Sequence, residues 1–153
     1  MQIKISKQGF TLIELLVVIA IIGLLASIVL VSFPTATAKA KDAKIISAVG
    51  QLRNLAAEYY TTSNTYTGYS MNVALTDSIT KQGGSAALFI NTAAGPNYGI
   101  GQAYCIVTAL VTSGAGFYCA DGTGVIGKTT TNTTCVTDCQ AAGTCLCPSG
   151  TSL

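Results

Sequence analysis

The chain has 153 residues, and only 9% of them are charged, well below the fraction of about a quarter that is usual in soluble domains. The formal net charge of +2 argues against the basic surface of a nucleic-acid-binding protein, and the absence of histidine excludes Ser-His-Asp and Cys-His nucleophiles. Because no cofactor motif appears either, the sequence predicts a protein that is not an enzyme and carries no cofactor.

Residues 10–33 form the first predicted element, an apolar run preceded by Lys4 and Lys7. At a rise of about 1.5 Å per residue, this run is long enough to cross the roughly 30 Å hydrocarbon core of a membrane. The preceding lysines place the N-terminus in the cytoplasm. The run contains one charged residue, Glu14, close to its cytoplasmic end. This carboxylate is either tolerated at the membrane edge, by snorkelling or protonation, or kept for a cationic partner that assembly supplies.

Small residues recur along the apolar run. Ala20, Gly23 and Ser27 follow one another at intervals of three and four residues, which places them on one side of a helix. Such a stripe lets helices approach each other closely in lipid. The alternative interpretation is that small residues are simply common in membrane helices.

Residues 34–60 form the second predicted element, an amphipathic helix that continues the membrane helix past Pro34. The proline removes one helical hydrogen bond, so we expect a bend or local melting there. The two halves together make a rod of about 50 residues, about 75 Å long, which a small globular domain cannot bury. Its first half must therefore pack in lipid or against other copies of itself, as in the core of a filament. The predicted apolar face consists of Ile45, Val49, Leu52, Ala56 and Tyr59, and the polar remainder of Lys39, Lys41, Asp42, Lys44, Arg53 and Glu58.

A second processing route has to be weighed at Ala36-Thr37-Ala38, an A-x-A pattern like that of a secretory signal peptide. Cleavage there would discard the apolar run and release a soluble protein. The apolar run is longer than the ~7–15 residues of a secretory signal, and Glu14 would have no purpose in it. We therefore expect the apolar helix to be retained.

Residues 61–100 are weakly patterned, and we expect little regular structure there, with residues 71–79 either a short helix or irregular. The clearest β signal follows at residues 103–120, where two runs of strand-forming residues flank a Gly-containing connection. These runs predict an antiparallel hairpin. The midpoint between Cys105 and Cys119 falls in the connection, so these two cysteines could face each other and form a disulfide.

The other four of the six cysteines lie in the tail, residues 135–147. In an oxidising compartment outside the cytoplasm they favour two disulfides, although four thiols can also bind zinc. Their C-x₃-C and C-x-C spacings are not the usual zinc pattern, so we expect no metal. Cys145 and Cys147 are too close to bond each other easily, so each is expected to pair with Cys135 or Cys139, in an order that the sequence leaves open. Because the tail has few large apolar side chains, these disulfides would replace a hydrophobic core.

The N-terminal sequence K-Q-G-F-T-L-I-E-L-L-V-V-I-A-I-I-G resembles the class III signal of bacterial type IV prepilins and type II secretion pseudopilins. The resemblance covers roughly residues 7–33. It implies that a prepilin peptidase cuts after Gly9, the last leader residue, and methylates the new N-terminal amine of Phe10. It also implies that Glu14 registers each incoming subunit, with the Phe10 ammonium of another subunit as its partner. Many pilins have proline where Val31 stands, whereas this chain has it three residues later.

The resemblance also bears on the far end of the chain. Many pilins have a C-terminal disulfide loop, which favours a pilin over a pseudopilin. Some pseudopilins bind calcium nearby, which makes Asp121 and Asp138 candidate ligands, although isolated acids in turns are more often solvated.

These observations predict an α+β fold. A long N-terminal helix, with a membrane half and an amphipathic half, packs against a small antiparallel sheet head with a disulfide-rich C-terminal loop. The expected divisions are a leader at residues 1–9, a filament-core helix at 10–33, an amphipathic half at 34–60 and a head at 61–153.

The function that we expect is that of a structural subunit of a type IV pilus. The alternatives are a pseudopilin of a secretion or competence system and a monomeric membrane-anchored binding module. The expected partners are further copies of the chain, the prepilin peptidase, membrane lipid, and an inner-membrane assembly platform with its ATPase. The subunit would reside in the inner membrane before assembly and in a surface fibre afterwards.

Overall fold

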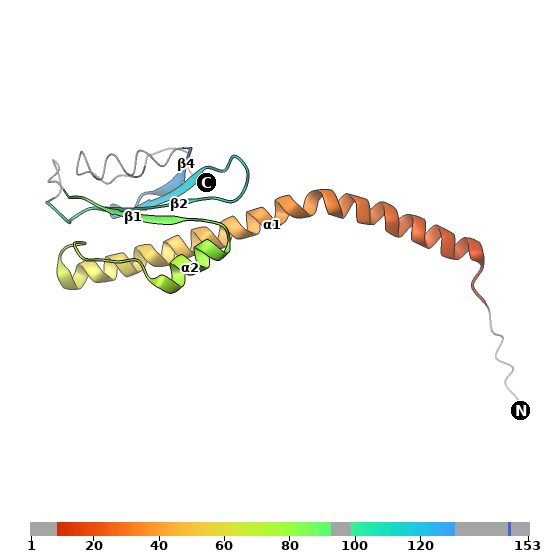
Figure 1. Cartoon of the computed structure of the whole chain (residues 1–153), viewed down its shortest axis with the longest axis horizontal. Helices are drawn as coiled ribbons and strands as arrows, with labels where there is room; N and C mark the ends of the chain where they lie inside the picture. The colour runs from red at the N-terminus through yellow and green to blue at the C-terminus, as the bar shows by residue number, and fades with distance from the viewer. Residues whose placement is uncertain (1–8, 93–98, 131–146, 148–153) are drawn as a thin grey trace, which may run out of the picture. The chain divides into compact units, whose positions relative to one another are not determined.

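The computed structural model describes residues 9–92, 99–130 and 147. The chain divides into two units between Thr37 and Ala38, and each unit is described by itself. The elements, in order, are α1 (Leu12–Ser63), α2 (Val73–Lys81), β1 (Ala86–Ile90), β2 (Tyr104–Ala109), β3 (Phe117–Asp121) and β4 (Ile126–Thr129) (Figure 1).

The helix α1 passes through Pro34 without interruption. The local melting that the sequence suggested at this proline is therefore wrong. Proline removes a single backbone donor, whereas starting a second helix would require a new nucleus, which is the unfavourable step in helix formation. The hydroxyl of Thr37 also donates to the carbonyl oxygen of Pro34 at 2.8 Å, which adds a local contact just past the proline.

In the first unit, α1 contains a stretch that is long and apolar enough to cross a membrane, with a mean hydropathy of 3.1 over 18 residues. That finding concerns length and composition. Every large apolar side chain in residues 10–33 is exposed in the isolated chain, from Phe10 at 88% to Phe33 at 63%.

The second unit contains one antiparallel sheet with the strand order β1-β2-β3-β4, so each strand pairs with its neighbour in sequence. The residues of α1 in this unit and α2 lie along the same face of the sheet (Figure 1). The long helix and the small antiparallel sheet confirm the predicted α+β fold.

The core between α1 and the sheet follows the expected helix stripe. Ile45, Val49, Leu52 and Ala56 are fully buried, whereas Tyr59 is only half-buried. Burial of each large aliphatic side chain in this stripe stabilises the unit by roughly 1.5–3 kcal/mol. Opposite them the strands contribute alternate residues to the same core: Leu88 and Ile90 from β1, Tyr104 and Ile106 from β2, and Tyr118 and Ala120 from β3.

The intervening strand residues point to the other face of the sheet, where they form a second buried cluster with Cys147. Both faces of the sheet are therefore covered. A strand buried on both faces reads as a continuous apolar run rather than an alternating one. The residues of β1, Ala86–Ile90, are partly buried against the clusters on both faces, which explains why this run carried no period-two signal, and the expectation of little regular structure at residues 61–100 is wrong.

The helix α2 is the other regular element in that region, and its ends are capped. The Asn72 side chain accepts a hydrogen bond from the amide of Leu75, as a helix N-cap does. At the other end, Gly83 adopts φ +94° and its amide bonds to the carbonyl of Thr80, while the Gly84 amide bonds to that of Ile79. This pair of bonds is a Schellman motif, which the Gly-Gly sequence could have indicated.

Candidate assembly segment and cysteine centre

The predicted processing site precedes the first helix. Gly9 and Phe10 are exposed and lie outside α1, which begins at Leu12. A peptidase needs an accessible backbone, and the exposed, non-helical Gly9 and Phe10 offer one. The peptide bond after Gly9 is therefore available in the isolated chain.

The carboxylate of Glu14 helps to cap the N-terminus of α1. Its Oε2 accepts hydrogen bonds from the backbone amide and the hydroxyl of Thr11, both at 2.8 Å, and the Thr11 hydroxyl accepts the Glu14 amide at 3.3 Å. This reciprocal pattern is a capping box, which Thr11-Leu12-Ile13-Glu14 shows in sequence but which we did not infer there. Glu14 Oε1 accepts no hydrogen bond from the described residues, so one oxygen stays available.

The small residues Ala20, Gly23 and Ser27 lie exposed along α1. Nothing outside the helix lies within 4 Å of the position that a Cβ on Gly23 would take. The Ser27 hydroxyl donates to the carbonyl of Leu24 at 2.7 Å, so this polar group is already satisfied within the helix. The stripe can therefore face lipid or another helix without leaving a donor unpaired.

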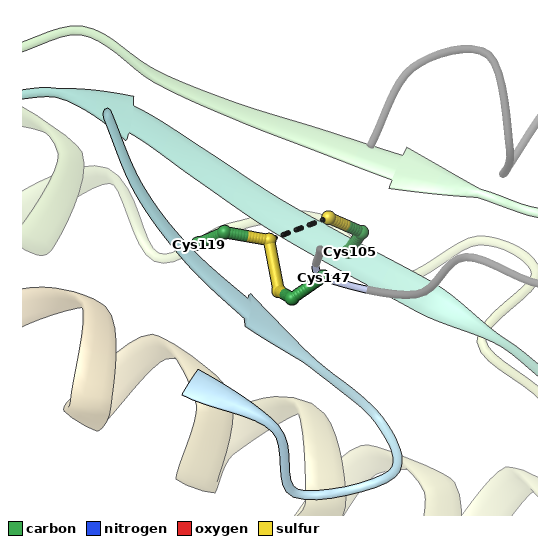
Figure 2. A group of neighbouring side chains, drawn as sticks. All are labelled: Cys105, Cys119 and Cys147. Atoms are coloured by element: carbon green, nitrogen blue, oxygen red, sulfur yellow. Dashed lines mark hydrogen bonds between the residues drawn. A yellow bond between two sulfur atoms is a disulfide. The ribbon is translucent and has the colours of Figure 1, made fainter. Parts of the chain in front are cut away.

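A cluster of three cysteine sulfurs lies on the sheet face away from α1 (Figure 2). Cys119 on β3 is joined by a disulfide to Cys147 of the tail, 28 residues later. Cys105 on β2 also belongs to a disulfide, and its sulfur lies 3.3 Å from that of Cys119. None of the described cysteines is a free thiol. Because thiolates are what bind metal ions, these three sulfurs do not offer a metal site.

Two of the predicted disulfides are wrong. Cys105 does not bond Cys119, and Cys147 does not bond Cys135 or Cys139, because Cys119 and Cys147 bond each other. The reason is the register of the hairpin. Cys105 stands opposite Asp121 and Cys119 opposite Val107, a two-residue offset from the pairing that would place the cysteines face to face. Cys135, Cys139 and Cys145 lie outside the described residues.

The carboxylate of Asp121, at the end of β3, is fully buried. Its Oδ1 accepts the Thr123 amide at 2.9 Å, the Thr123 hydroxyl at 2.7 Å and the Val125 amide at 3.0 Å. Its Oδ2 accepts the Cys147 amide at 2.9 Å. Asp121 is thus neither a solvated turn residue nor a free calcium ligand, but the group that holds the β3–β4 turn and the backbone of Cys147. Asp138 lies outside the described residues.

Asp42 is a second buried carboxylate that the sequence interpretation placed wrongly among the exposed polar residues. It is only 6% exposed, and its Oδ1 accepts the Val111 amide at 2.6 Å. Its Oδ2 accepts the Thr112 amide at 3.2 Å. Asp42 therefore ties α1 to the β2–β3 connection. Asp42 lies three residues before Ile45, on the same face of the helix, and this spacing could have indicated its burial.

Tyrosines join the distal end of α1 to the sheet. The ring centroid of Tyr66 lies 4.5 Å from that of Tyr104 and 4.7 Å from that of Tyr60. Burial raises the pKa of Tyr104 well above the ordinary tyrosine value, and the neighbouring Tyr66 adds to the effect. Burial also raises the pKa of Tyr66. Both hydroxyls are therefore neutral at physiological pH.

Comparison with known proteins points to one family. A family model described as the prokaryotic N-terminal methylation motif matches residues 5–30. The type IV major fimbrial protein FimA of Dichelobacter nodosus is 42% identical over 50 residues, which are 33% of this chain and 32% of that protein. The fimbrial protein EcpC of Eikenella corrodens is 40% identical over 58 residues, 38% of each chain.

The type IV major pilin protein PilE1 of Neisseria gonorrhoeae is 41% identical over 54 residues, 35% of this chain and 33% of that protein. The similarity thus spans about a third of the curated relatives, and no solved structure matches the chain significantly. The methylation motif, the named relatives and the long apolar helix that carries Glu14 agree: the N-terminal part of this chain is similar to that of type IV pilins.

Proposed function

We propose that the chain is a structural subunit of a type IV pilus, and that it polymerises through the first part of α1 into an extracellular fibre. The observation that carries this proposal is the exposed apolar face of that segment. Seventeen large apolar side chains in residues 10–33 are exposed. At roughly 1.5–3 kcal/mol for each, leaving them in water costs on the order of 25 kcal/mol or more. Lipid must cover them before assembly, and the same segments of other copies afterwards.

Processing comes first in this mechanism. A prepilin peptidase cuts the exposed bond after Gly9 and methylates the amine of Phe10. The capping box survives this cut, because the amide that Thr11 donates to Glu14 belongs to the bond between Phe10 and Thr11. The mature helix therefore keeps its N-terminal cap and gains a positive charge next to it.

Assembly then brings charges from two subunits together. The Phe10 ammonium of one subunit meets the free Oε1 of Glu14 on its neighbour. An unpaired charge in an apolar filament core would cost several kcal/mol, so the pair favours the one register in which both charges are matched. The stripe of Ala20, Gly23 and Ser27 lets the neighbouring helices approach closely. The energy for extraction from the membrane comes from a partner ATPase at an inner-membrane platform.

The substitution Glu14→Gln tests this mechanism. Glutamine can replace glutamate in a capping box, so the helix cap stays while the charge is lost. We expect normal membrane insertion and processing but no fibres on sheared cells in electron microscopy. Thr11→Val is the matched control, since it removes the cap hydroxyl and keeps the carboxylate, and it should still yield fibres. Abundant fibres from the Glu14→Gln variant would refute the charge pairing.

Mass spectrometry of the extracted protein tests the processing step. A mature chain that begins at methylated Phe10 supports the proposal, whereas one that begins at Lys39 would mean secretory cleavage after Ala38. The relatives named as major pilins and fimbrial proteins favour a pilin over a pseudopilin. The length of the fibres separates the two, because a pseudopilin would form short ones.

A further inference from the structure

A cavity of about 250 Å³ opens on the second unit, between the start of its helix and the β2–β3 connection. It is lined by Lys39, Asp42, Ala43 and Ile46 of α1, by Thr112 and Ala115 of the connection, and by Lys128 of β4.

Two lysines, Lys39 and Lys128, line this cavity. Neither Lys39 nor Lys128 forms an ion pair with any described residue. The one acid among the lining residues, Asp42, is buried, and both of its oxygens are occupied by the backbone amides of Val111 and Thr112. The backbone amides therefore stabilise this carboxylate, and the two lysines and one acid that line the cavity leave it a net positive charge, which favours an anion.

A hydroxyl in the same cavity wall is also unsatisfied. The Thr112 Oγ1 is buried and has no hydrogen-bond partner among the described residues. A buried hydroxyl without a partner is unfavourable, and one that lines a cavity is commonly satisfied by a ligand or water. Two ammonium groups and a hydroxyl are a suitable donor set for a phosphate group.

The chain itself brings this cavity close to one source of phosphate. Lys39 follows Phe33, the last large apolar residue of the membrane segment, by six residues. Six residues span at most about 20 Å even when fully extended, so the tether keeps Lys39 near the lipid headgroups at any angle between the units. Basic residues next to a membrane helix attract anionic lipids by about 1 kcal/mol each.

We propose that the cavity between Lys39, Lys128 and Thr112 binds the phosphate of an anionic phospholipid headgroup while the subunit waits in the membrane. This inference rests on the membrane stage of the proposed function and goes beyond it. A second copy of the chain is the less favoured occupant, because the exposed acids among the described residues of the second unit are only Glu58 and Asp77. Glu58 lies 19 residues along α1 from Lys39, about 28 Å at the standard helical rise, and lines other cavities.

The test uses the full-length protein in neutral detergent micelles. Dioctanoyl phosphatidylglycerol, dioctanoyl phosphatidylcholine and glycerol 3-phosphate are titrated separately, and bound species are counted by native mass spectrometry. The double variant Lys39→Gln/Lys128→Gln should lose on the order of tenfold in affinity for phosphatidylglycerol. The matched control Lys41→Gln/Lys44→Gln removes the same charge from exposed positions of α1 outside the cavity and should change the affinity less than about twofold.

A third variant, Thr112→Val, keeps the backbone amide that Asp42 accepts and removes the unsatisfied hydroxyl. It should weaken phosphatidylglycerol binding without lowering the melting temperature, which separates a binding role from a structural one. A lowered melting temperature would mean that the hydroxyl is structural and would count against the site.

Four results would overturn the inference. Equal losses of affinity in both double variants would mean diffuse attraction to basic residues. Equal affinity for phosphatidylcholine would mean that binding does not depend on the net negative charge of the headgroup. Tight binding of glycerol 3-phosphate would point to a soluble phosphate ester. Loss of protein dimers rather than lipid adducts in the Lys39→Gln/Lys128→Gln variant would point to a second copy. None of these measurements depends on fibre formation. A negative result here would therefore not refute the proposal that the chain assembles into fibres, which the Glu14→Gln variant tests.

Discussion

Replacing Asp121 by asparagine should destabilise the head more than its small chemical change suggests. An asparagine side chain can present one oxygen to the three donors on the Thr123 and Val125 side, but its amide nitrogen then faces the Cys147 amide. A hydrogen bond from a buried amide to a charged acceptor is lost and the amide is left unpaired, at a cost of about 1–3 kcal/mol. The three remaining bonds lose their charged acceptor, which adds a further cost of roughly 1 kcal/mol.

The expected loss is therefore about 2–4 kcal/mol, or on the order of 10 °C in melting temperature for a unit of this size. The assay is thermal unfolding of the full-length protein in detergent, followed by the near-ultraviolet circular dichroism of the buried tyrosines. Asp77→Asn is the control, because it makes the same chemical change at an exposed acid of α2. If both variants melt within about 2 °C of each other, which is near 0.5 kcal/mol, Asp121 does not hold the turn and the tail in the way described.

Two further predictions concern the core and the glycines. Because burial raises the pKa of Tyr104, the unfolded state releases its phenolic proton first, so stability is fully present below about pH 10 and is lost as the pH rises further. Denaturant titrations from pH 8 to pH 11.5 should show this alkaline loss in the wild type and a smaller loss in Tyr104→Phe, and equal losses would contradict the burial. Gly84→Ala should destabilise the head by about 1–3 kcal/mol, because a Cβ there would lie 2.9 Å from Ile79 Cγ2 and 3.2 Å from the backbone oxygen of Ala109. Gly50→Ala, on an open face of α1 with nothing within 4 Å, should instead stabilise it by up to about 1 kcal/mol, and denaturant midpoints that rank the two variants in the reverse order would refute this packing.

The elements that depend on local sequence were the ones that could be predicted. The apolar run, the charged residue within it and the stripe from Ile45 to Ala56 are properties of one helix and its neighbours along the chain. The β2–β3 hairpin was also visible, because strand-forming residues surround a Gly-containing connection. The strand β1 was missed because both of its faces carry apolar, partly buried side chains, which removes the alternation that identifies a strand.

The sites that depend on register could not be predicted in this way. A shift of two residues in the pairing of β2 with β3 places Cys105 diagonally from Cys119 rather than directly opposite it, and Cys119 bonds Cys147 instead. The burial of Asp42 and Asp121 likewise depends on which backbone amides the β2–β3 connection and the tail bring to them. A buried carboxylate that accepts hydrogen bonds from backbone amides stabilises the fold, whereas a carboxylate in a solvated turn contributes little.

The sequence alone determined that this chain has a long apolar helix with one acid near its start, and that such a helix needs lipid or other helices around it. That conclusion requires no partner within the chain, since hydrophobicity and helical period are read along a single segment. Only the tertiary structure decided that Cys119 pairs with Cys147, that Asp42 and Asp121 are buried, and where a cavity lined by Lys39 and Lys128 opens. These features arise between segments far apart in the chain, where the hairpin register and the path of the connections set which groups meet.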